Sequence, residues 1–196
     1  MKRFLTIALV LPFAAGGFAT VASADAGAFE YGWTIGTAAG PFVNTGPFAP
    51  GLLTLKLWYV CNSDLGMAAA EFRLASKNLA NVILAFTPKS GFLNAGGSTH
   101  LLLAVGGCPD AQPRGMPINV GDILILSNAP GGYHITTAPN GNKVTVDCRP
   151  LPQAHPIQWI GFSNDGTPPQ QKDWDKCTNP VSVDDSSWGQ IKAIYR

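Results

Sequence analysis

Short apolar runs separated by glycine, proline and polar turns constrain the fold of this chain more than any other feature. Residues 52–61, 99–108 and 122–127 are such runs, and they are rich in leucine, isoleucine, valine and aromatics. The 22 glycines and 16 prolines are scattered along the whole chain and punctuate these runs. Several short strands with turn signals between them are typical of a β-sandwich or β-barrel. In the run at 122–127, Ile123 and Ile125 alternate with Leu124 and Leu126, so both faces of the strand are apolar. We therefore expect this strand to be covered on both faces.

The segment MAAAEFRLASKNLANVILAF, residues 67–86, has two interpretations. Its alanine, glutamate, arginine, leucine and lysine residues favour one long helix by propensity. Apolar Phe72 and Leu74, however, alternate with charged Glu71 and Arg73, which is the period of a half-buried strand. A polar Ser-Lys-Asn stretch then separates this run from a second apolar run. We therefore predict two strands joined by a turn, with Glu71 pointing away from the core.

The dipeptide Asn140-Gly141 lies between two alternating segments, 133–138 and 143–148. Both central positions of a tight hairpin turn need a positive φ, which asparagine and glycine tolerate better than other residues. The sequence therefore predicts a hairpin in which these two segments pair with each other.

The first 24 residues have the pattern of a secretory signal peptide. Lys2 and Arg3 precede an apolar stretch that runs to about residue 18, and Ala22-Ser23-Ala24 is an A-x-A cleavage site. The alternative is a membrane anchor, but the small-residue end favours cleavage, and no later apolar run is long enough to span a membrane. We expect a protein that is secreted, extracellular or periplasmic, with residues 25–196 forming one domain.

The charge and cysteine content indicate which partners and cross-links the protein has. After cleavage, 11 of the 13 basic residues remain against 12 acidic ones, and no basic block predicts a nucleic-acid partner. An even number of cysteines in an exported chain indicates two disulfides. Four cysteines allow three connectivities. We predict Cys61–Cys108, because each ends an apolar run, and Cys148–Cys177, because they bracket an irregular, proline-rich segment at 149–180.

The end of the chain, residues 187–196, is predicted to form a short helix. Trp188, Ile191 and Tyr195 recur on one helical face, and Ser187 is followed three residues later by a glutamine, as in a capping box. A helix this short does not persist alone, so we expect it to dock on the sandwich as a lid. A strand and a sorting signal are the alternatives.

Two stretches carry a resemblance to a known family. The run GMAAAEFRLASKNLANVILAFTPKSG and the later NVGDILILSN resemble parts of a cohesin-type module, over about residues 45–150. Cohesin-like domains are nine-stranded sandwiches in a jelly-roll topology and are related to a class of carbohydrate-binding modules. The cysteines and the proline-rich segment depart from that pattern. We expect an all-β fold, a single Ig-like or jelly-roll β-sandwich with a short C-terminal helix.

The residues that could carry catalysis are few. No nucleophile elbow of the G-x-S-x-G type occurs, and His100, His134 and His155 are the candidate imidazole bases. Two of these histidines fall in predicted strands, where packing is the commoner role. No clustered metal-ligand motif occurs either, and the loop aspartates are best interpreted as turn formers. A calcium site gathered from separate loops is the alternative. We predict no enzyme, no metal and no cofactor.

Aromatic residues indicate a binding site. Trp174 lies between Asp173 and Asp175, and a flat ring beside carboxylates can stack on a sugar and bond its hydroxyls. Together with Trp159 and Tyr133 these residues are the candidate glycan site. The alternative is that Trp174 folds back over the end of the sandwich as an anchor.

We therefore expect a secreted, non-enzymatic binding or structural module for a glycan or a protein partner, with its oligomeric state open. A secreted hydrolase of unrecognised type is the second interpretation. A subunit of a cell-surface assembly that pairs through an exposed sheet edge is the third.

Overall fold

The computed structural model describes residues 32–60, 66–107 and 117–171. Within these ranges every regular element is a β-strand and no helix occurs, so none is long and apolar enough to cross a membrane. The strands are β1 (Gly32–Gly36), β2 (Gly51–Tyr59), β3 (Ala69–Ser76), β4 (Val82–Pro88), β5 (Phe92–Asn94), β6 (His100–Val105), β7 (Ile118–Ser127), β8 (Gly132–Thr136), β9 (Val144–Val146), β10 (Ala154–Pro156), β11 (Gln158–Ile160), β12 (Phe162–Ser163) and β13 (Gln170–Gln171).

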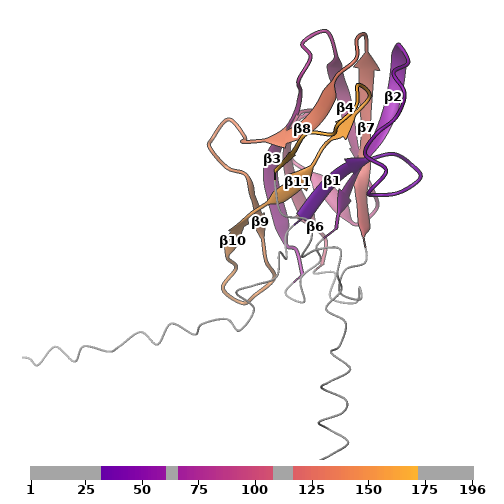
Figure 1. The fold of residues 1–196 in the computed structure, drawn as a ribbon. Helices are drawn as coiled ribbons and strands as arrows, with labels where there is room; N and C mark the ends of the chain where they lie inside the picture. Colours follow the sequence, from indigo (N-terminus) through magenta and orange to yellow (C-terminus); the bar gives the residue numbers. More distant parts are fainter. Residues whose placement is uncertain (1–31, 61–65, 108–116, 172–196) are drawn as a thin grey trace, which may run out of the picture.

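The strands form two sheets, and the prediction of an all-β fold is confirmed for the described part of the chain (Figure 1). One sheet, here called sheet A, has the order β13-β11-β1-β2-β7-β4. The other, sheet C, has the order β10-β9-β3-β6-β5, with β8 and β12 joined to it through β3. All neighbours are antiparallel except β1 and β11, which pair in parallel.

The segment 67–86 forms two strands, as its alternation predicts, and not a helix. The two strands belong to different sheets, because β3 pairs with β6 while β4 pairs with β7. The turn between them is fixed by Asn81, whose side chain accepts hydrogen bonds from the backbone N–H groups of Asn128 and Ala129 and donates one to the carbonyl of Ala129. The connection therefore crosses from one layer to the other at the end of the sandwich.

The predicted pairing across Asn140-Gly141 is wrong. Strands β8 and β9 both pair with β3, one after the other along the same edge, and not with each other. Arg73 pairs with Thr136 and Glu71 with Val144, so the intervening residues leave the sheet and return two positions further along β3. Gly141 does have the expected positive φ of 92°. The dipeptide does form a turn, but this turn lies within the segment that leaves the sheet between β8 and β9, here called the latch loop (residues 137–143). The hairpin in this part of the chain is formed by β9 and β10.

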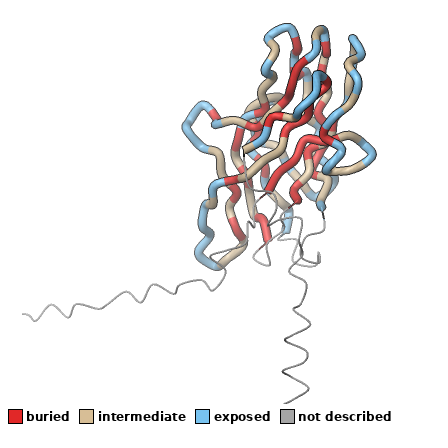
Figure 2. The backbone as a smooth tube through the Cα atoms, in the orientation of Figure 1, coloured by how far each residue is buried: buried red, intermediate tan, exposed pale blue. Residues whose placement is uncertain are grey.

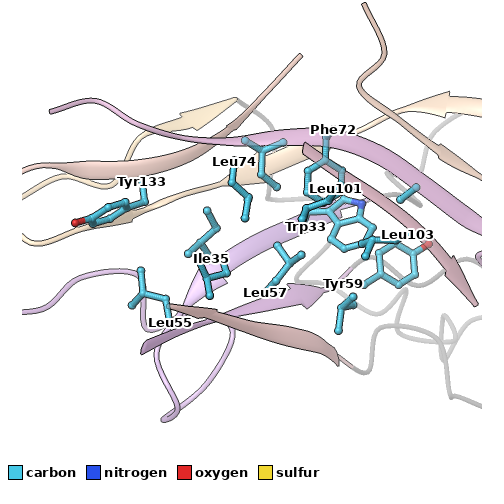
Figure 3. Close-up of a cluster of buried hydrophobic side chains, with 14 of the residues drawn as sticks. Trp33, Ile35, Leu55, Leu57, Tyr59, Phe72, Leu74, Leu101, Leu103 and Tyr133 are labelled. Atoms are coloured by element: carbon cyan, nitrogen blue, oxygen red, sulfur yellow. The ribbon is translucent and has the colours of Figure 1, made fainter. Parts of the chain in front are cut away.

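The core lies between the two sheets, as Figure 3 shows for its largest members. The indole ring of Trp33 in sheet A packs edge-on against Phe72 in sheet C, with centroids 4.9 Å apart. The same indole N–H donates to the buried hydroxyl of Thr145 over 3.0 Å, so the sheets are also joined by a hydrogen bond. This bond satisfies the indole nitrogen, which would be costly to bury alone. Figure 2 shows that buried residues are concentrated in the strands and exposed residues at the loops.

The proline-rich segment is more regular than expected where it is described. Four short strands, β10 to β13, lie within it and contribute to both sheets. Cys148 is engaged in a disulfide. The other three cysteines, its partner among them, lie outside the described residues, so the disulfide pairing stays a prediction. The leader at 1–24 and the C-terminal helix predicted at 187–196 also lie outside them, and the helix stays a prediction as well.

Candidate binding surfaces

Five apolar side chains gather on the outer face of sheet A. Leu52 of β2 pairs with Leu126 of β7, and Leu126 pairs on its other side with Val82 of β4, so the three form one row across the strands. Leu124 lies two residues before Leu126 in β7, and Leu84 lies beside it at a bulge in β4. Leu52 is 71% exposed and Leu84 is 43% exposed. We call these residues the leucine patch. Contiguous exposed apolar side chains of this kind mark interaction sites more often than scattered ones do.

A group of charges borders the leucine patch along the same strands. Asp122 of β7 bonds Lys56 over 2.8 Å and Lys89 over 3.0 Å. These lysines, Lys56 first, hold the pKa of the Asp122 carboxyl below its ordinary value against the opposing effect of burial. Two cations against one anion leave this border with a net positive charge.

The outer face of sheet C has a polar centre. Glu71 of β3 points outward, as expected, but its carboxylate is only 13% exposed because the latch loop folds against it. Asn140 donates to one carboxylate oxygen over 2.7 Å and Asn142 to the other over 2.5 Å. His100 of β6 lies 2.9 Å from the first oxygen. We call these four residues the Glu71 cluster.

The Glu71 cluster keeps its carboxylate charged. The hydrogen bond from Asn142 is the largest influence, and with those from His100 and Asn140 it lowers the pKa of Glu71 despite partial burial. Hydrogen bonds to the charged form of a carboxyl group stabilise that form. Both carboxylate oxygens of Glu71 accept hydrogen bonds from within the molecule. The main effect of the Glu71 cluster is therefore to fasten the latch loop to the sheet.

A second carboxylate is buried at the β9–β10 hairpin. Asp147 is fully buried, and it accepts hydrogen bonds from the guanidinium of Arg149 over 2.6 Å and from the backbone N–H of Gln153 over 3.0 Å. His155 lies 2.8 Å from the same carboxylate. Burial alone would raise the pKa of Asp147, but the bonds from Arg149 and His155 hold it well below its ordinary range. The paired charges indicate a structural role at the root of the hairpin.

The three imidazoles named as candidate bases lie at three separate places. His100 and His155 each contact a carboxylate, in the Glu71 cluster and at Asp147 respectively. His134 packs on the indole of Trp159, with ring centroids 5.7 Å apart, and burial lowers its pKa. Each imidazole is therefore accounted for by packing or pairing, and the described residues include no group of three His, Cys, Asp or Glu side chains that could hold a metal ion.

The candidate glycan residues do not form one exposed face where they are described. Tyr133 is 1% exposed and lies in the core against Phe162, so its ring has no free face for a sugar. The expectation for Tyr133 is therefore corrected: Tyr133 and Ile135 are the inward positions of β8. Trp159 is partly buried and packs against the core. Trp174, Asp173 and Asp175 lie outside the described residues.

The leucine patch was missed by the sequence reasoning, which expected 122–127 to be covered on both faces. In the structure Ile123 and Ile125 are buried, while Leu124 and Leu126 are half-exposed on the outer face. A signal was present in the neighbouring strands, since Leu52, Val82 and Leu84 occupy the outward positions of strands whose inward positions are also apolar.

Comparisons with known proteins give a likeness of fold only. No family model matches the chain, and no curated protein matches it. Among solved structures, the seventh ScaB type I cohesin from Pseudobacteroides cellulosolvens has a TM-score of 0.48 at 8% identity, over 68% of this chain and 89% of that one. The third cohesin of ScaC from Acetivibrio cellulolyticus, solved with the ScaB dockerin, has a TM-score of 0.47 at 11% identity, over 67% of this chain and 95% of that one. Both of these solved structures are cohesins, the type of module that two stretches of the sequence resemble.

Proposed function

We propose that the protein is a secreted, non-enzymatic binding module whose partner is another protein, and that the partner docks on the leucine patch. The observation that carries the proposal is the contiguous row of Leu52, Leu126 and Val82 on the outer face of sheet A. The centres of protein interfaces are apolar and their rims are polar, and the leucine patch with its charged border has this composition. Export is inferred from the leader at residues 1–24.

The border of the patch defines the chemistry of the partner. Lys56 and Lys89 outnumber Asp122, and Lys89 is the more exposed of the two lysines. A complementary surface is apolar at its centre and acidic on the side that meets these lysines, because complementary charge steers association and fixes orientation. A second copy of the chain would bring like charge to the same border in a symmetric face-to-face dimer, which is less favourable.

The other interpretations receive less support. Among the strands at the ends of the two sheets, β4 is the longest, but it contains a bulge between Ile83 and Ala85 and ends at Pro88. Bulges and prolines are devices that keep edge strands from pairing. A hydrolase needs a base beside a reacting group, whereas the three histidines occupy packed or paired positions. Glycan binding stays a prediction for Trp174 and its flanking aspartates.

A matched pair of variants tests the proposal. Leu84 lies in the leucine patch and is 43% exposed, while Leu102 lies on the outer face of sheet C and is 41% exposed. Residues 25–196 are immobilised and used to capture proteins secreted by the source organism, and the captured protein is then titrated against both variants. Leu84→Asp should weaken binding at least about tenfold, which corresponds to 1.4 kcal/mol. Leu102→Asp should leave binding unchanged.

The results of this experiment either support docking on the leucine patch or overturn it. Circular dichroism and thermal melts of the two variants establish that both fold. Loss of binding in Leu102→Asp with retention in Leu84→Asp would place the partner on sheet C and overturn the proposal. Binding on a glycan array with no protein captured, or a dimer of the chain that Leu84→Asp disrupts, would replace the proposed partner with a glycan or with a second copy.

A further inference from the structure

The latch loop contains two asparagines in nearly equivalent settings. Asn140 and Asn142 are both exposed, and each donates its side-chain amide to a different oxygen of Glu71. They differ in the residue that follows, which is Gly141 after Asn140 and Lys143 after Asn142. This difference bears on the chemical stability of the two amides.

Glycine leaves the asparagine before it open to attack by the backbone. The backbone nitrogen of Gly141 can bond to the side-chain Cγ of Asn140, which closes a five-membered imide as the Cγ–Nδ2 bond breaks and ammonia leaves. Water then opens the imide to aspartate or isoaspartate, so no reactant besides water is needed. A Cβ on the following residue hinders this attack, and glycine has none. We propose that Asn140 is a site of spontaneous deamidation and that the reaction unlatches the loop from the outer face of sheet C.

The folded structure restrains the reaction. The backbone N–H of Gly141 donates to the carbonyl of Ala138 over 2.9 Å, and the side-chain oxygen of Asn140 accepts from the backbone N–H of Asn142 over 3.1 Å. Together with the bond from Asn140 to Glu71, these contacts hold the amide away from the attacking nitrogen. Deamidation therefore requires a local opening of the latch loop, and Glu71 sets the rate by keeping the loop closed.

The product cannot restore the contact. Deamidation replaces the amide donor of Asn140 by a carboxylate that faces the carboxylate of Glu71. Two like charges at hydrogen-bonding distance repel each other, and Glu71 loses one of its donors. The loop between β8 and β9 then keeps the bond from Asn142 to Glu71 and, at its end, the bond from Lys143 to Gln171. Its tip at Asn140 is released, and the outer face of sheet C around Glu71 and His100 becomes more accessible.

The experiment uses residues 25–196 incubated at mildly alkaline pH and sampled over days. Peptide mass spectrometry should find the mass change of amide to acid at Asn140 at a rate several-fold higher than at Asn142, which serves as the internal control. Glu71→Ala should raise the rate at Asn140 several-fold. In the deamidated protein, and in Asn140→Asp, the backbone amides of residues 138 and 140–143 should exchange with deuterium faster than in the unmodified chain.

Three results would overturn the inference. One is an Asn140 that stays intact while the chain remains folded for the whole incubation. The second is equal conversion at Asn140 and Asn142, which would remove the role of Gly141. The third is a deamidated loop that exchanges as slowly as the unmodified loop, which would show that the reaction occurs without releasing the latch. If deamidation yields little product, the Asn140→Asp variant can be compared with the unmodified chain in the same exchange measurement.

Discussion

The two outer faces of the sandwich differ in what becomes of their outward side chains. On sheet C the central outward residue is Glu71, and residues 137–143 fold over it and satisfy both carboxylate oxygens. On sheet A the outward residues of β2, β7 and β4 include four leucines, and these stay exposed or half-exposed. One face is covered by its own chain, and the other carries apolar side chains that no described residue covers.

The difference arises from how the chain leaves and rejoins each sheet. Between β8 and β9 the chain departs from β3 and returns to the same edge, so the excursion necessarily lies beside Glu71. The turns that follow β4 and β7 lie at the ends of these strands, and no described segment covers the outward side chains of Leu52, Val82 and Leu84 (Figure 1). Polar side chains can be satisfied within one chain, whereas exposed leucines gain only when another surface covers them.

The largest effect should come from the buried carboxylate of sheet C. Asp147→Ala removes the partner of Arg149 and His155 and is expected to lower the free energy of unfolding by about 3 kcal/mol. Urea denaturation of the variant and the parent chain measures this difference. Asp122→Ala on sheet A is the control, and equal losses in the two variants would remove the distinction between a buried and an exposed ion pair.

The pH dependence of stability sharpens the same comparison. The pKa of Asp147 is lower in the folded chain than its ordinary value of about 3.9. Its contribution is therefore complete above about pH 4 and is lost as the pH falls through the folded-state pKa. We expect Asp147→Asn to lose less stability than the parent chain between pH 5 and the acid limit of folding, as measured by urea midpoints. A steeper loss in the variant would contradict the assignment.

A smaller effect should come from the Glu71 cluster. Glu71→Ala removes the acceptor of three side chains and is expected to cost about 1–2 kcal/mol. Because the contacts are local, deuterium exchange should accelerate chiefly at residues 137–143 while the amides of β6 stay protected. Slow exchange throughout the latch loop would mean that Glu71 does not fasten it.

The smallest effect should come from the border of the leucine patch. Asp122→Asn leaves Lys56 and Lys89 without their anion, but these groups are partly exposed and screened by solvent, so the loss of stability should be under about 1 kcal/mol. Thermal melts at low and high salt measure it. A loss as large as that of Asp147→Ala would show that this border stabilises the fold rather than bordering a docking surface.

Local patterns predicted the strands well and their partners poorly. The alternation of Phe72 and Leu74 with Glu71 and Arg73 gave β3 correctly, because burial of one face imposes the period of two. Asn140-Gly141 gave a turn with the expected φ, but a turn signal carries no information on which strand its flanks will pair with. That choice is made by β3, which is more than 60 residues earlier in the chain.

The candidate surfaces were predicted less completely, for similar reasons. Glu71 was expected to point outward, but its contacts with Asn140 and Asn142 join residues that are distant in sequence. The exposure of Leu124 and Leu126 could not be derived from their run, since a strand that is apolar on both faces has the same sequence whether or not its second face is covered. Tyr133 looked like a surface ring until its strand was placed in the core.

The most direct test of the account is amide deuterium exchange of residues 25–196 with and without the captured partner. Strand β4 (Val82–Pro88) is an edge of sheet A and contributes Val82 and Leu84 to the leucine patch, whereas β6 (His100–Val105) lies in sheet C. If the partner docks on the leucine patch, it slows exchange in β4 and leaves exchange in β6 and the latch loop unchanged. Slowed exchange in β6 and the latch loop, with β4 unaffected, would contradict it.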